Sequence, residues 1–64
     1  FGGVTPLMLA CQMGHIQVVE ILVKHGANVN HRAVRYEGTP LTEAKRFKHK
    51  EIVEYLKKHG AVAE

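Results

Sequence analysis

Apolar residues follow a helical period in two separate stretches of the chain. Each stretch has them at the i, i+1, i+4 spacing of one helix face: Val18, Val19 and Leu22 in the first, Ile52, Val53 and Leu56 in the second. A glycine follows each stretch, at Gly26 and Gly60. Glycine commonly follows the last turn of a helix because it adopts the left-handed conformation without strain. The pattern therefore predicts two helices that end just before these glycines.

A shorter helix is predicted before each of these two. Thr5 precedes Pro6, and Thr39 precedes Pro40. A threonine hydroxyl can cap a helix N-terminus, and proline is favoured at the first helical position because its missing N–H is not needed there. The first of these short helices should end at Gly14.

The two helix pairs are copies of one unit. Aligning residues 5–30 with residues 39–64, at an offset of 34, gives twelve identities in 26 positions. A fixed period of this length is the signature of a repeat architecture. Residues 27–38 lie between the helix pairs and have no helical period. We expect them to form an extended, exposed connection.

The repeated unit resembles the ankyrin repeat. The residues that carry the resemblance are Gly3-Val4-Thr5-Pro6-Leu7, Ala10, Gly14-His15, Val18-Val19, Leu22 and Gly26-Ala27 through Val29-Asn30. The resemblance implies an all-α solenoid fragment, in which two helix-turn-helix units stack side by side and are joined by a β-hairpin-like finger. It also implies a role in binding rather than catalysis.

Three features depart from the family's usual pattern. Met8 and Thr42 stand where the family usually has a histidine that hydrogen-bonds within and between repeats. The connection is one residue longer than the usual 33-residue period, and residues 35–38 lack the usual aspartate of the hairpin turn. We therefore expect an altered hydrogen-bond network in both units and a distorted finger.

The second unit is charged at five positions where the first is apolar or small. Leu9, Cys11, Gly14, Ile16 and Val23 are replaced by Glu43, Lys45, Lys48, Lys50 and Lys57. A terminal repeat needs a polar outer face, and burying five charges without partners would be prohibitive. The sequence therefore predicts that these five side chains meet water, with residues 1–33 an internal-type repeat and residues 34–64 a C-terminal capping repeat. Because stacked repeats stabilise one another, further repeats are expected before Phe1.

The charge of the chain is concentrated in the second unit. The 64 residues include nine Lys and Arg and six Asp and Glu, a net charge of +3, and eight of the nine basic residues fall within residues 32–64. Such asymmetry can indicate nucleic-acid binding, but acidic residues interleave with the basic ones, and a solvated capping face explains them. Nucleic acid is therefore the less favoured partner.

Two further features concern the location of the chain. Its longest apolar run is the five residues 7–11, where a membrane-spanning helix needs about 20. One cysteine permits no internal disulfide, and no leader segment is recognisable. We expect a protein without a membrane segment, in the cytoplasm or the nucleus.

No residue pattern predicts catalysis. The duplicated histidines match no short metal-ligand spacing and are expected in turns and caps: His15 and His49 between helices, His25 and His59 before the terminating glycines, with His31 an exposed finger residue. Cys11 is expected to pack as a small hydrophobe, and Glu20 and Glu54 to be solvated. Neither a phosphate-binding loop nor a paired acid and base is present. We expect no enzyme activity, no metal, no cofactor and no small-molecule substrate.

The favoured function is a protein-interaction module that binds a partner protein or peptide. The ankyrin resemblance places the contacts on the inner helices and on the finger: Gln12, Met13, Arg46 and Phe47 on the former, Val4, His31, Arg32, Arg35 and Tyr36 on the latter. Packing beneath a neighbouring finger is the alternative for Met13 and Phe47, and a local hairpin contact is the alternative for Tyr36. Two other functions remain open, a regulatory or scaffolding C-terminal segment of a larger enzyme or channel, and self-association through the first unit.

Overall fold

Helix α1 (Pro6–Met13) begins where the Thr-Pro pair predicts. The Thr5 hydroxyl accepts a hydrogen bond from the backbone N–H of Met8 at 3.3 Å, and Pro6 is the first helical residue. Helix α3 (Pro40–Arg46) repeats this arrangement with Thr39. These caps satisfy N–H groups that a helix N-terminus otherwise leaves without partners.

Thr42 extends the second cap into a reciprocal pair. Its hydroxyl accepts a hydrogen bond from the Thr39 N–H at 2.7 Å, while its own N–H donates to the Thr39 hydroxyl. Met8, at the same position of α1, is fully buried instead. The expected alteration of the histidine network is therefore confirmed, because Thr42 forms a capping box and Met8 contributes to the core.

Helices α2 (Ile16–Lys24) and α4 (Lys50–Lys58) end as the glycines predict. Gly26 has a φ of 93°, and Ala27 N–H closes the end of α2 by donating to the Leu22 carbonyl at 3.0 Å. This is the hydrogen bond that a left-handed glycine after the C-cap permits. Gly60, with a φ of 98°, ends α4 in the same way.

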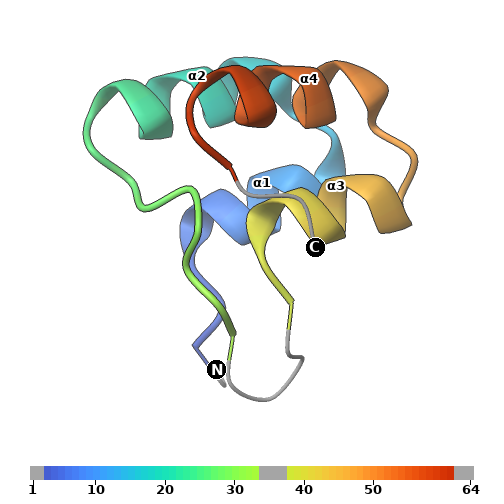
Figure 1. Ribbon diagram of the computed structural model, residues 1–64, viewed down its shortest axis with the longest axis horizontal. Coiled ribbons are helices and arrows are strands. Elements are labelled where there is room, and N and C mark those ends of the chain that lie inside the picture. Colours follow the sequence, from blue (N-terminus) through green and yellow to red (C-terminus); the bar gives the residue numbers. More distant parts are fainter. Residues whose placement is uncertain (1–2, 34–37, 62–64) are drawn as a thin grey trace.

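The four helices form two layers (Figure 1). The structure is a computed structural model that describes residues 3–33 and 38–61 of the chain. Helices α1 and α3, which we call the inner helices, form the layer from which the finger segments extend, and α2 and α4 form the other layer (Figure 1). Each inner helix packs against the helix that follows it, and α1 also packs against α3. The all-α architecture of two helix-turn-helix units is confirmed.

The core runs continuously through both units. Its buried side chains come from all four helices: Leu7, Ala10, Cys11, Val19, Leu41, Ala44, Ile52 and Leu56. The inner helices contribute residues from matching positions of the two repeats, since Leu7 and Ala10 correspond to Leu41 and Ala44. The units therefore share one apolar interior.

The connection between the units is more buried than its lack of a helical period predicts. Ala33 and Gly38 form an antiparallel bridge, in which the Ala33 N–H donates to the Gly38 carbonyl at 2.8 Å, and both residues are buried. The Asn30 side-chain amide donates to the Gly60 carbonyl at 3.0 Å. The expectation of an exposed connection is thus wrong for these two bridge residues, because they pair with each other at the base of the finger and Gly38 lies against Thr42 and Glu43 of α3. The predicted distortion of the finger concerns residues 34–37, which lie outside the described ranges.

Four of the five charged positions of the second unit are exposed as predicted: Lys45, Lys48, Lys50 and Lys57. The fifth prediction is wrong, because Glu43 is only 3% exposed. Its position belongs to the opposite side of the repeat, which meets the preceding unit. The matching residue of the first unit, Leu9, is 49% exposed for the same reason, since no unit covers that side in this structure.

Candidate functional site

Met13 and Phe47 occupy equivalent positions at the ends of the two inner helices. Met13 is the last residue of α1, and Phe47 is the C-cap of α3. Met13 is 65% exposed and Phe47 is 48% exposed. Two large apolar side chains are therefore presented at matching places of neighbouring units.

Gln12 and Arg46 precede these residues and differ in their surroundings. Arg46 is exposed. Gln12 is half-buried, and its side-chain amide donates to Glu43 Oε1 at 2.9 Å. Part of Gln12 thus links the two repeats rather than facing solvent freely, which the sequence did not predict.

His49 forms a second link between the repeats, on the same segment of α1. Its ring Nε2 lies 3.1 Å from the backbone carbonyl of Gln12, to which it donates. The ring also lies against Gly14, where a Cβ would be 2.6 Å from His49 Cε1. Glycine is therefore required at position 14 for two reasons: its φ of 79° is left-handed, and the imidazole occupies the space that a side chain would need. The sequence predicts His49 in a turn, which is correct, but it does not predict this contact.

The finger residues are only partly described. Val4 is half-buried, and Arg32 is exposed. His31, which the sequence predicts to be exposed, is half-buried, because its Nε2 donates to the Gly3 carbonyl at 2.6 Å. Arg35 and Tyr36 lie outside the described residues. The structure thus ties the start of the finger to the segment that precedes α1.

Cys11 lacks the properties of a nucleophile. It is fully buried, and burial together with the nearby Glu43 carboxylate raises the pKa of its thiol from 9.0 to about 12. A reactive cysteine needs a lowered pKa and access to solvent. Within residues 3–33 and 38–61, no group of three His, Cys, Asp or Glu side chains is arranged to hold a metal ion.

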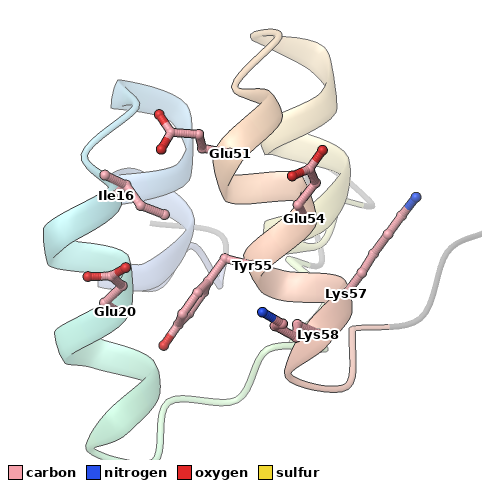
Figure 2. Close-up of a pocket in the computed structure, with 7 residues that line it drawn as sticks. All are labelled: Ile16, Glu20, Glu51, Glu54, Tyr55, Lys57 and Lys58. Atoms are coloured by element: carbon pink, nitrogen blue, oxygen red, sulfur yellow. The ribbon is translucent and has the colours of Figure 1, made fainter.

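The sequence did not predict a groove that lies between α2 and α4 (Figure 2). It has a volume of about 640 Å³ and is lined by Ile16, Glu20, Glu51, Glu54, Tyr55, Lys57 and Lys58. The Tyr55 side chain extends from α4 toward α2, which carries Glu20, while Glu51 and Glu54 lie toward the start of α4 and two lysines lie toward its end (Figure 2). Because the groove is open and carries both signs of charge, it lacks the enclosed apolar walls of a small-molecule site.

The basic residues of the second unit do not form an uninterrupted surface. Six are exposed: Lys45, Arg46, Lys48, Lys50, Lys57 and Lys58. Glu51 and Glu54 are exposed on α4, the helix that carries three of them. No helix in the described part of the chain is both long and apolar enough to cross a membrane.

Comparison with known proteins gives a consistent result. A family model described as ankyrin repeats (3 copies) matches residues 2–64. Over 28 residues, the chain is 61% identical to an ankyrin repeat and KH domain-containing protein of Caenorhabditis briggsae. Over a segment of the same length it is 57% identical to the ankyrin repeat and KH domain-containing protein mask-1 of Caenorhabditis elegans. Each match covers 44% of this chain but only 1% of the relative.

Proposed function

Because the chain belongs to the ankyrin-repeat family, we propose that it is a protein-interaction module that binds a partner protein or peptide. The contacts lie on the inner helices and on the finger. This places Gln12, Met13, Arg46 and Phe47 at the centre of the binding surface, with Val4, His31, Arg32, Arg35 and Tyr36 at its rim.

The observation that carries this proposal is the exposure of Met13 and Phe47. Large apolar side chains that are exposed at neighbouring places commonly mark interaction surfaces, because water is displaced from them on binding. Methionine, aromatic residues and arginine are also enriched in such interfaces. Arg46, directly before Phe47, supplies a charged group that can bind a carboxylate with two hydrogen bonds.

A peptide-display selection tests the proposal and does not require the partner to be identified first. Peptides selected on the wild-type chain should bind Phe47→Ala and Arg46→Glu at least tenfold more weakly, since interface anchors commonly contribute more than about 1.4 kcal/mol. Lys50→Glu is the matched control, because it makes the same charge change on an exposed residue away from the inner helices. Peptides that bind all three variants equally well would contradict the proposed surface.

A second candidate function is a regulatory or scaffolding segment of a larger protein. It is favoured by the relatives, which are ankyrin proteins of which the matched segment is 1%. In this case residues 34–64 serve as the C-terminal capping repeat, with their exposed lysines toward water, and further repeats precede residues 1–33. Mass spectrometry of the native protein, captured with an antibody against this chain, tests this second role: a mass near 7.2 kDa contradicts it.

A further inference from the structure

Each repeat has an upstream face, the side that meets a preceding repeat. In the second repeat this face comprises Glu43, Ile52 and Tyr55, and the first repeat covers it: Glu43 and Ile52 are buried and Tyr55 is half-buried. The equivalent residues of the first repeat are Leu9, Val18 and Ile21, and all three are exposed large hydrophobic residues. The two upstream faces therefore share a geometry, but they differ in chemistry where Glu43 replaces Leu9.

Glu43 meets two residues of α1 across the junction. Oε1 accepts the Gln12 amide at 2.9 Å, and the carboxylate lies close enough to Cys11 to raise the pKa of its thiol. Oε2 is buried without a hydrogen-bond partner among the described residues. It lies beside Gly38, where a Cβ would be 2.8 Å away. In the part of the chain that the structure describes, the hydrogen bond to this side chain comes from Gln12.

This arrangement makes Glu43 sensitive to the repeat that precedes it. A buried carboxylate that loses its donor retains the full cost of desolvation, which is larger than the net value of the hydrogen bond. Leu9 has the opposite requirement, because an apolar side chain gains by contact with another apolar group and gains nothing from an amide. A unit suited to one upstream face is thus poorly suited to the other.

We propose that the position shared by Leu9 and Glu43 determines which kind of repeat stacks stably on the upstream face of each unit. The second repeat accepts on its upstream face a unit with a hydrogen-bond donor at the position of Gln12. The upstream face of the first repeat accepts an ankyrin-type repeat with an apolar residue at that position. That this occupant is an ankyrin-type repeat is inferred from the molecule itself, because the equivalent face of the second repeat is covered by one; the apolar residue at the position of Gln12 is inferred from the apolar chemistry of Leu9.

A second copy of this chain does not fit the upstream face of the first repeat in the same stacking. The side that it would present carries Lys45, Lys48, Lys50 and Lys57, all exposed. In the first repeat the corresponding residues, which face the second repeat, are Cys11, Gly14, Ile16 and Val23. Packing four lysines against an apolar face would remove water from their charged groups without providing partners, which is unfavourable. The proposal concerns contacts between stacked repeats and does not rest on the proposed partner-binding function.

A double-mutant cycle in the 64-residue chain tests the Glu43 half of the proposal. By urea unfolding, Gln12→Leu should lower the folding equilibrium constant at least tenfold, as expected for a lost hydrogen bond to a buried charged group. Glu43→Leu should change it less, because the half-buried Gln12 amide can reach water. In the Glu43→Leu background, Gln12→Leu should instead raise the folding equilibrium constant, because two apolar side chains then meet at this position. Additive effects of the two substitutions would overturn the proposal.

A three-repeat chain tests the part of the proposal that concerns Leu9. It also tests the proposal if one of the variants of the 64-residue chain fails to fold. A copy of residues 1–34 is fused to the N-terminus of the chain as an added first repeat. Four variants are compared: the added repeat has Gln or Leu at its counterpart of Gln12, and the original chain has Leu9 or the substitution Leu9→Glu. When residue 9 is Leu, the urea midpoint should be higher for the variant with Leu at the added counterpart of Gln12. When residue 9 is Glu, it should be higher for the variant with Gln there. A preference that does not depend on residue 9 would overturn the proposal.

Discussion

The His49 imidazole lies against Gly14 and donates a hydrogen bond to the Gln12 carbonyl at 3.1 Å, so one ring joins the start of α4 to the end of α1. The contact is possible only because residue 14 has no side chain. It connects two local features, the glycine that ends a helix and the histidine that precedes the next one, across the junction between repeats.

Gly14→Ala should therefore destabilise the chain by about 2 to 3 kcal/mol. About 1 to 2 kcal/mol arises from the left-handed conformation, and the rest from displacement of the His49 ring and loss of its hydrogen bond. Gly26→Ala is the matched control, since Gly26 also has a positive φ but a Cβ there would meet nothing within 4 Å. Urea unfolding that gives equal losses for the two variants would show that the His49 contact contributes nothing.

Lys48 is the counterpart of Gly14 in the second repeat, and it adopts a φ of 61°. Because a side chain strains this conformation, Lys48→Gly should stabilise the chain by about 0.5 to 1 kcal/mol. Lys45→Gly, inside α3, should instead destabilise it by about 1 kcal/mol through lost helix propensity. Thermal unfolding of both variants checks the sign, and a lower melting temperature for Lys48→Gly would contradict the prediction.

The Cys11 thiol predicts a pH dependence of stability. Its pKa is raised from 9.0 to about 12 in the folded chain, so above pH 9 the unfolded chain loses this proton first. The stabilisation that the neutral thiol provides is complete below pH 9 and is lost as the pH rises toward 12, with a slope of about 1.4 kcal/mol per pH unit. The unfolding free energy of Cys11→Ala, measured over the same range, should lack this component. Parallel curves for the two proteins would contradict it.

The interleaved charges of the second repeat predict weak binding to nucleic acid. Glu51 and Glu54 lie among the basic residues of α4, which lowers the positive potential that a phosphate backbone requires. In fluorescence anisotropy at physiological salt, the dissociation constants for single-stranded RNA and duplex DNA should exceed about 10⁻⁴ M. This is the weakest value typical of proteins that bind nucleic acid non-specifically. Tighter binding that weakens steeply with salt would support a nucleic-acid partner instead.

Local features of the fold could be predicted from sequence, because they depend on residues close together in the chain. The Thr-Pro pairs fix the starts of α1 and α3, and Gly26 and Gly60 end α2 and α4 within one turn. The duplication indicated two copies of one unit, and the resemblance to the ankyrin repeat implied that they stack. The helix boundaries required only the period of the apolar residues and the chemistry of helix ends.

The two sides of the repeat could not be distinguished from sequence. Glu43 shares with four lysines the property of replacing an apolar or small residue, so the sequence predicts all five to be solvated. Burial depends on which neighbour a position faces, and that is a tertiary property. The same reason applies to the Gln12 amide, to the His49 contact and to the groove of α2 and α4, each of which joins residues from different helices.

The most direct test of the proposed binding surface is NMR mapping of a bound peptide. A peptide selected on the wild-type chain is titrated into the ¹⁵N-labelled protein, and the backbone amide shifts are followed. The proposal predicts that the largest changes fall at Gln12, Met13, Arg46 and Phe47, with smaller changes along the finger. Changes that are confined to Glu20, Glu51 and Tyr55, in the groove between α2 and α4, would contradict it.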